Sequence, residues 1–475
     1  MSRCYALLVA VALVPAALNA QPIRLTPDVD PTSASAYTCP ASCVAPNCQC
    51  GTTTPTPAIA ASEIPQFLVV TVGDCINTSS EALLAPVLFD GSLHNPDGRP
   101  LPITYYLSLE GCATGNGTSS APLVKARYDA GHEIAVHTRT HSTGSSTGAT
   151  TWTNEITYVK TWLQDAGLNV ARDVKGFRAP YLATNNTMFT VLAQQGFLYD
   201  ASVMESPFYS TVSTGLGGFL WPYTFDYGRA QRCSSWAPGN NCPTSSLPGL
   251  WEVPVYEYVS TANPDANPNY YGSMDLGGPQ AYSGYPTRFE GQALLDIYAM
   301  HFDARYAGNR APMTLPFHAD GFDSEARQRD VRTAIAAMLA HPNVWAVTTT
   351  GLIEWMQNPM PASQMVAWMN AYCQRHPCSA PAATASDDDA PAAAQDVRVF
   401  PNPARGSFAV SATLATPGPA TVEVLDVLGR TVRQAEGTGR FQATFSTDGL
   451  APGMYLVRVI DAAGRASAPQ RLVVR

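Results

Sequence analysis

Apolar positions recur with two different periods through the middle of the chain, residues 65–378. Phe67–Val72 is a continuous apolar run rich in β-branched residues, which is typical of a strand buried on both faces of a parallel sheet. Helical spacing places Ile156 and Val159 on one face of a helix predicted over Asn154–Ala166. Further strands are predicted at Ile103–Leu107, Ile134–Val136 and Val344–Thr348, and further helices at Ala121–Ala130, Asn186–Gln195, Gly291–Tyr306 and Ser324–Ala340. This alternation predicts an α/β fold, a distorted barrel of parallel strands.

The pattern changes after residue 378. Residues 379–395 are rich in Ala, Pro and Asp and are predicted to be a linker. Beyond it, short segments alternate apolar and polar residues and are separated by glycine turns. These segments are Val397–Phe400, Ala420–Leu425, Phe441–Phe445 and Met454–Val459. Residues 396–475 are therefore predicted to form a small immunoglobulin-like β-sandwich.

The first twenty residues read as a secretory signal peptide. Arg3 precedes the apolar stretch Ala6–Ala17, and cleavage after Ala20 is expected. The stretch is too short to cross a membrane, and no later stretch is long enough, so we expect no transmembrane segment.

Composition narrows the possible partners. Apolar residues make up 45% of the 475-residue chain, which suits a large core, and the net charge is −9 with 14% charged residues. The sequence contains no basic stripe, which argues against a nucleic-acid partner.

Ten cysteines follow the signal peptide, and an even number in an exported chain predicts disulfides. Cys75 and Cys112 follow two strands that should be neighbours and are expected to pair, and Cys233 should pair with Cys242. Cys373 and Cys378 are expected to close the domain, with each other or against the N-terminal cluster. That cluster, Cys39, Cys43, Cys48 and Cys50, lies within the Cys-rich segment and connector 38–64; a four-cysteine zinc site is the rival interpretation.

Ligand-type residues follow the predicted strands. His137 and His141 stand four positions apart, a spacing that lets two imidazoles bind one metal ion, although two unrelated loop histidines would give the same weak motif. Asp74, Arg178, Glu252 and His318 also follow strand-like runs. In a parallel barrel these strand ends share one face, so the residues are expected to converge there.

Four motifs carry a family resemblance: Thr71-Val-Gly-Asp74, His137-x-x-x-His141, Arg178-Ala-Pro-Tyr181 and Leu315-Pro-Phe-His318. In order and spacing they resemble the polysaccharide deacetylases with a NodB-type domain. Longer phrases, such as Gly131–His137 and Ile353–Asn358, are similar to the insect-type chitin deacetylases, whose catalytic domain also follows a Cys-rich segment. The resemblance covers roughly residues 38–378, with the catalytic domain expected at 65–378.

This resemblance implies a secreted hydrolase that depends on zinc, or on another divalent ion such as cobalt, and that removes N-acetyl groups from chitin or a related N-acetylglucosamine polymer. Asp74, His137 and His141 would be the metal ligands and His318 the general acid. Arg178 would orient the catalytic base, and the backbone amide of Tyr181 would hold the oxyanion. We also expect Tyr181, Trp221 and Glu252 to bind substrate. Trp221 belongs to the aromatic residues of long predicted loops, whose flat faces suit sugar rings, although loop packing explains most of them equally well.

One position departs from the family pattern. The family carries two adjacent aspartates after the first strand, the first being the general base, whereas this chain has Gly73-Asp74. Losing a general base typically costs about 10²–10⁴-fold in rate. Asp320 is a conceivable substitute. A catalytically silent glycan-binding protein, or a structural surface protein, is therefore an alternative function.

The tail carries a second resemblance. Phe400-Pro-Asn-Pro403, Gly429-Arg430 and Leu450–Tyr455 look like the C-terminal sorting domain of the type IX secretion system. This implies contact with that machinery, export through the outer membrane of a Bacteroidota-type cell, and removal of the domain from a secreted or surface protein. An ordinary immunoglobulin-like binding module is the alternative.

Overall fold

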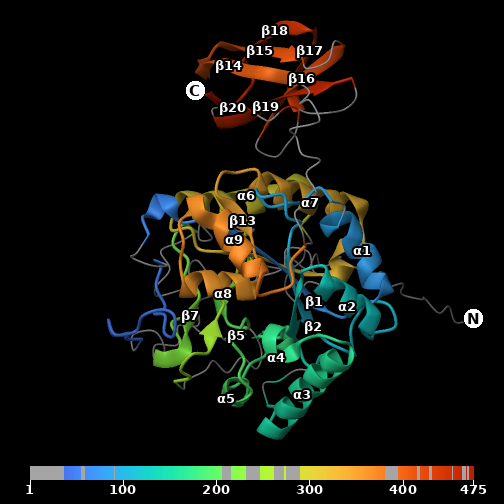
Figure 1. Cartoon of the computed structure of the whole chain (residues 1–475), viewed down its shortest axis with the longest axis vertical. Coiled ribbons are helices and arrows are strands. Elements are labelled where there is room, and N and C mark those ends of the chain that lie inside the picture. The colour runs from blue at the N-terminus through green and yellow to red at the C-terminus, as the bar shows by residue number, and fades with distance from the viewer. Residues whose placement is uncertain are drawn as a thin grey trace, which may run out of the picture.

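The computed structural model describes two regions, an α/β region and a C-terminal all-β region (Figure 1). The described residues are 37–379 and 394–475, except 55–58, 90, 143, 145, 206–215, 232–245, 261–271, 274–288, 415–417, 427–430, 452, 463–466 and 468–469. The predicted signal peptide, most of the linker and the Cys233–Cys242 pair lie outside the described residues.

A nine-stranded sheet forms the centre of the α/β region, in the order β12-β1-β2-β3-β4-β5-β8-β7, with β13 also pairing with β1. All neighbours are parallel except the antiparallel pair β7 and β8. The strands are β1 (Gln66–Asp74), β2 (Ile103–Leu107), β3 (Glu133–Val136), β4 (Gly176–Phe177), β5 (Tyr199–Asp200), β7 (Tyr223–Thr224), β8 (Trp251–Glu252), β12 (Met313–His318) and β13 (Val344–Ala346). Two small ladders pair β6 (Met204–Glu205) with β9 (Val255–Tyr256), and β10 (Tyr258–Val259) with β11 (Gly272–Ser273).

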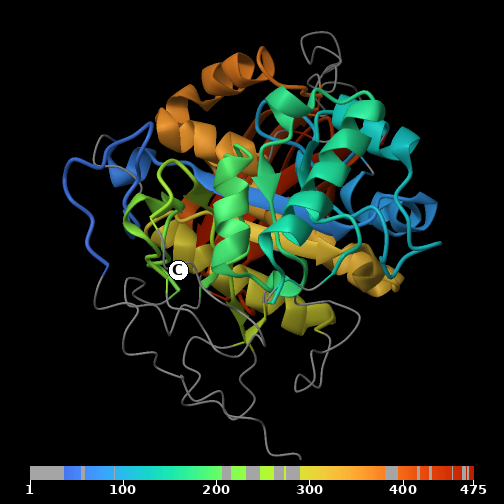
Figure 2. The ribbon, with the colours of Figure 1, turned by 90° about the horizontal axis from the view of Figure 1, so that it is seen from below.

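Both faces of strand β1 are buried, which explains why its sequence is continuously apolar. Phe67 and Val69 belong to one core cluster, while Leu68, Val70 and Val72 belong to another, so the two faces of the strand are both covered. Figure 2 shows β1 crossing the middle of this region between helices. The predicted α/β class and the predicted parallel strands are confirmed. Within the described residues no pairing joins β7 back to β12 or β13, so the barrel is incomplete.

Helices cover the strands. They are α1 (Thr78–Leu88), α2 (Ala121–Asp129), α3 (Ala149–Asp165), α4 (Val170–Asp173), α5 (Asn186–Gln194), α6 (Gly291–Ala307), α7 (Glu325–Leu339), α8 (Thr349–Gln357) and α9 (Met365–Cys373). On α3, Trp152, Ile156, Val159 and Leu163 are all buried, and their spacing puts them on a single face. The helix α8 contributes Leu352, Ile353 and Trp355 to the same core cluster as Phe67. None of the helices in the described part of the chain is long and apolar enough to cross a membrane.

The Cys-rich segment covers an edge of the sheet. Disulfides join Cys39 to Cys50 and Cys43 to Cys48. The backbone N–H of Thr224 in the edge strand β7 donates to Gln49 O at 3.0 Å. This pairing shields an edge that would otherwise present free backbone groups. Because all four thiols form disulfides, the zinc interpretation of the cluster is wrong.

Two further disulfides lie in the described region. Cys75 pairs with Cys112, as predicted, and joins the segments that follow β1 and β2. Cys373 pairs with Cys378 rather than with the N-terminal cluster.

The C-terminal region consists of seven strands in the order β17-β16-β19-β20-β14-β15-β18. They are β14 (Ala394–Arg405), β15 (Ser407–Leu414), β16 (Pro419–Leu425), β17 (Thr431–Thr438), β18 (Arg440–Ser446), β19 (Gly453–Asp461) and β20 (Gln470–Val474). Alternate residues such as Val422, Val424, Val457 and Val459 form its core. A small all-β region is confirmed, and its immunoglobulin-like classification stays a prediction.

Candidate metal centre

Three predicted metal ligands converge at the carboxyl ends of β1 and β3, two parallel strands that lie on either side of β2. Asp74 ends β1, and His137 and His141 follow β3. Nε2 of His141 lies 3.0 Å from Oδ1 of Asp74, and Nε2 of His137 lies 3.8 Å from the same oxygen. All three ligand atoms are within 4.8 Å of one another. The set of one carboxylate and two imidazoles is the one used in catalytic zinc sites that leave positions open for water and substrate.

The backbone around these ligands has an uncommon conformation. Asp74, Thr138 and His141 have positive φ angles of 81°, 65° and 52°. Non-glycine residues rarely adopt this region, and such residues concentrate at functional sites. The segment between the two histidines is a turn and not a helix, so the turn, and not helical spacing, brings the rings together.

Hydrogen bonds fix the orientation of His137. Its Nδ1 lies 2.7 Å from Arg178 O, which leaves Nε2 facing Asp74. Its carbonyl oxygen accepts a hydrogen bond from Ser108 Oγ at 2.6 Å. A carbonyl that holds one ring nitrogen directs the other toward a metal, as in established metal sites.

The electrostatic environment favours the ligand forms of these groups. Burial lowers the pKa of His137 to about 3, so its imidazole is neutral near pH 7. Burial by itself would raise the pKa of Asp74, but contact with His141 and attraction to His318 and His137 hold that pKa below its ordinary value. The buried Oδ1 of Asp74 nevertheless accepts no well-aligned hydrogen bond. A carboxylate oxygen with an unused lone pair beside two ring nitrogens fits a bound cation.

Arg178 directly follows β4 and contacts His137 through its carbonyl oxygen. Its side chain is buried, its Nε donates to Ala201 O at 2.9 Å, and its Nη1 donates to Thr71 Oγ1 at 3.1 Å. The guanidinium also lies 3.9 Å from the centroid of the Tyr106 ring. Arg178 is therefore held next to His137, one of the predicted ligands.

Glu252 lies in the core and not in the substrate-binding position that was predicted for it. It is fully buried, pairs in register with Asp200 of β5, and accepts a hydrogen bond from Val203 N at 3.0 Å. Burial raises the pKa of both carboxyls, and the charge of Asp200 raises the pKa of Glu252 further. The prediction that Glu252 contacts substrate is corrected, because its carboxyl faces Asp200 inside the core. Asp200 was not among the predicted site residues, although it also ends a strand.

The prediction that Trp221 binds substrate is also corrected. Its ring is fully buried and stacks on Trp355 with centroids 6.1 Å apart, and its Nε1 donates to Asn309 O. A buried ring cannot stack on a sugar, so Trp221 serves the core. The structure does bring Tyr181 to the centre: the residue is 48% exposed, and the centroid of its ring lies 4.8 Å from that of the His141 ring.

His318 lies against Gly73, at the position where the sequence departs from the family pattern. The two residues face each other in the β1–β12 register. A Cβ atom added to Gly73 would lie 3.1 Å from both Cδ2 and Nε2 of His318. The imidazole therefore borders the space that a side chain at position 73 would need. Asp320 lies in the short turn Ala319–Phe322 that follows β12.

Comparisons with known proteins show the family to which this chain belongs. The model of the polysaccharide deacetylase family matches residues 105–199, and the chain is 30% identical over 346 residues to chitin deacetylase 1 of Bombyx mori. It is also 30% identical over 325 residues to chitin deacetylase 8 of the same organism, an alignment that covers 67% of this chain and 77% of that protein. The chain belongs to the polysaccharide deacetylase family.

The match to chitin deacetylase 1 covers 70% of this chain and 59% of that longer protein. Among solved structures, the chain is similar to a polysaccharide deacetylase from Mycobacterium smegmatis, with a TM-score of 0.39 and 18% identity over 64% of this chain and 94% of that chain. The chitin deacetylase from Colletotrichum lindemuthianum gives a TM-score of 0.24 and 17% identity over 31% and 59% of the two chains. Residues 398–475 match the secretion system C-terminal sorting domain, which indicates secretion or display at the cell surface.

Proposed function

We propose that this protein is a secreted, metal-dependent deacetylase that hydrolyses N-acetyl groups of chitin or a similar N-acetylglucosamine polymer. The observation that carries the proposal is the convergence of Asp74, His137 and His141 on one point in a chain of this family. These residues would hold zinc, or another divalent ion such as cobalt. When bound, such an ion would polarise the acetyl carbonyl and make the attacking water more acidic.

The protein's own residues would then complete the hydrolysis. A C–O bond forms between the attacking water and the acetyl carbon, and the C–N bond breaks. His318 would give its proton to the departing amine, because an amine leaves only when protonated. The backbone N–H of Tyr181 would donate to the oxygen that gains negative charge. Arg178 would keep His137 in place through its carbonyl oxygen.

Turnover is proposed to be slow. Gly73 has no side chain that could take the proton of the attacking water, so the proton would pass to solvent unless Asp320 accepts it. The usual contribution of a general base is about 10²–10⁴-fold, and that contribution is missing. Asp320 stays a candidate substitute.

A glycan-binding protein without turnover is the second candidate, and Gly73 is the observation that favours it. Metal content does not separate the two functions, because both retain the ligands. Release of acetate from N-acetylated chitin pentasaccharide, assayed with added zinc, does separate them. Slow but measurable release supports the deacetylase, whereas tight binding without acetate supports the second candidate.

A further inference from the structure

Ser108 lies between the two strands that carry the predicted metal ligands. Strand β2 pairs with β1 on one side and with β3 on the other, and its last residue, Leu107, stands in register with both Asp74 and Val136. Ser108 directly follows β2 and is fully buried. It therefore lies between the strand that ends in Asp74 and the strand that His137 follows.

Ser108 forms hydrogen bonds with the main chains of two predicted ligands. Its backbone N–H donates to Asp74 O at 3.2 Å, and its hydroxyl donates to His137 O at 2.6 Å. Asp74 needs such support, because its φ of 81° is uncommon for a residue with a side chain and persists only where the surrounding structure fixes it. One buried residue thus joins the two ligand-bearing segments directly.

A second hydroxyl group holds Ser108 itself in place. Ser119 Oγ donates to Ser108 O at 2.7 Å and accepts a hydrogen bond from Ile76 N at 3.1 Å. Ile76 lies two residues after Asp74, and its carbonyl oxygen accepts a hydrogen bond from Ser120 N at 2.8 Å. The segment that follows Asp74 is therefore joined to Ser108 through Ser119 as well.

The residues after Ser108 hold the turn that carries His141. The backbone N–H groups of Leu109 and Glu110 donate to Arg139 O, in the middle of that turn, at 3.0 and 2.8 Å. Both bonds join main-chain groups, so a side-chain substitution at Ser108 removes neither their donors nor their acceptor. The loop that begins at Ser108 therefore supports the segments of all three predicted ligands.

We propose that Ser108 is a positioning residue of the metal centre, and that its hydroxyl raises the affinity for a divalent ion by fixing His137 relative to Asp74. The ring of His137 is oriented by Arg178 O, whereas its backbone is held by Ser108. Groups that orient metal ligands typically contribute about 10–100-fold to metal affinity. The proposal rests on the proposed function, because it takes Asp74, His137 and His141 as the ligands.

The substitution Ser108→Ala tests this by removing the hydroxyl and keeping the backbone N–H. We expect the Kd for zinc, measured on the full chain by competition with a chelating dye after the metal has been stripped, to rise about tenfold. The visible absorption spectrum of the cobalt-loaded variant should also differ from that of the wild type, because these bands depend on the ligand geometry around the ion. Ser119→Ala removes only the support of Ser108 O and should raise the zinc Kd by a smaller factor.

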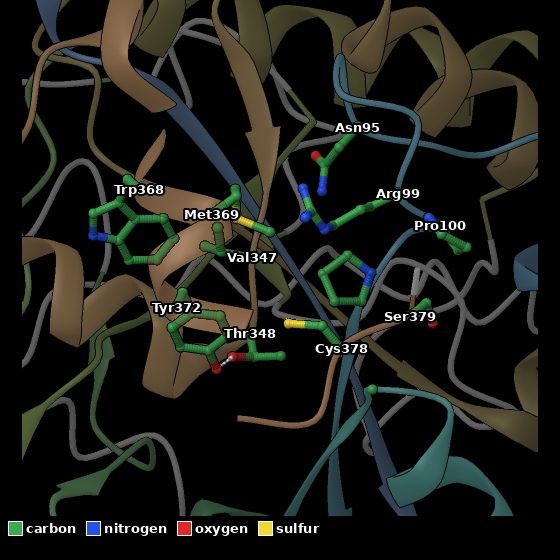
Figure 3. Close-up of a pocket in the computed structure, with 12 residues that line it drawn as sticks. Asn95, Arg99, Pro100, Val347, Thr348, Trp368, Met369, Tyr372, Cys378 and Ser379 are labelled. Atoms are coloured by element: carbon green, nitrogen blue, oxygen red, sulfur yellow. Dashed lines mark hydrogen bonds between the residues drawn. The ribbon is translucent and has the colours of Figure 1, made fainter. Parts of the chain in front are cut away.

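Thr348→Val is the matched control, because it also deletes one buried hydroxyl. Figure 3 shows the hydroxyl of Thr348 bonded to that of Tyr372, at 2.9 Å, beside a pocket of about 20 Å³. The same pocket is lined by Pro102 and Gly131, which precede β2 and β3, so Thr348 lies near the amino ends of these strands and away from the ligands. The control should lower the free energy of unfolding, because Thr348 caps α8, and should leave the zinc Kd and the cobalt spectrum unchanged.

The outcomes separate this inference from the proposed function. If the wild type binds zinc but Ser108→Ala keeps the zinc Kd or the cobalt spectrum of the wild type, Ser108 does not position the ligands. An equal loss of zinc affinity in Thr348→Val would show that lowered stability, and not the contacts of Ser108, weakens the centre. If Ser108→Ala does not fold, an unchanged zinc Kd in Ser119→Ala overturns the claim. If the wild type itself binds no zinc, the proposed function fails together with this inference.

Discussion

At the scale of single residues, the proposed slow turnover depends on Gly73. Gly73→Asp would supply a carboxylate beside the metal centre and should raise the rate of acetate release by about one or more orders of magnitude. The gain requires His318 to move by a few tenths of an ångström, since an added Cβ lies 3.1 Å from its ring. Gly73→Ala adds the same crowding without a carboxylate and should lower the rate. No gain in Gly73→Asp, with metal still bound, would favour the glycan-binding function.

A substitution at His137 tests the assignment of the metal ligands without a measurement of turnover. His137→Ala removes the best-oriented imidazole of the three-ligand set and should abolish stoichiometric zinc, as measured by elemental analysis of purified protein. His94→Ala, at an exposed histidine outside the centre, serves as the control and should retain about one zinc per chain. Full zinc content in His137→Ala would place the ligands elsewhere.

At the scale of elements, His376 joins three helices after the end of α9. Its Nε2 lies 2.6 Å from Glu354 of α8, and its Nδ1 lies 3.6 Å from Asp173 of α4. Burial alone would lower the pKa of His376, but the two carboxylates outweigh it and raise that pKa to about 9. Because the folded-state pKa exceeds the ordinary value near 6.5, the stabilisation is complete below about pH 6.5 and is lost as pH rises through about 9.

Urea unfolding at pH 6 and pH 9.5 measures this contribution. The wild type should lose stability between the two values, and His376→Gln should lose less, because glutamine carries no charge at either pH. Lys125→Gln, which removes an exposed ion pair within α2, should leave the pH dependence unchanged. An identical pH dependence in the wild type and His376→Gln would show that the ion pairs do not stabilise the junction.

The elements themselves were largely predictable from the sequence. Phe67–Val72 lies within β1 because its apolar residues cover both faces, and the spacing of Ile156 and Val159 identified α3. The convergence of the three candidate metal ligands was also predictable, because parallel strands of such a fold end on one face. Trp221 and Glu252 were misplaced because their partners, Trp355 and Asp200, are distant in sequence. Local composition does not reveal whether an aromatic residue in a glycine-rich stretch packs inward.

At the scale of the whole molecule, the match to the sorting domain predicts that the C-terminal region is removed by proteolysis. We expect the mature protein in the native culture medium to end within or near Ser379–Gln395, after removal of residues 396–475. Intact-mass spectrometry of the secreted protein measures the end point. A mature chain that still ends at Arg475 would favour a permanent binding module.

The central claim is that the centre formed by Asp74, His137 and His141 makes this chain a metal-dependent deacetylase. The most direct measurement is acetate release from fully acetylated chitin pentasaccharide by protein stripped with a chelator and then titrated with zinc. We predict no release by the stripped protein, and slow release that saturates near one zinc per chain. Undiminished release by the stripped protein, or stoichiometric zinc with no acetate at any pH, would contradict the account.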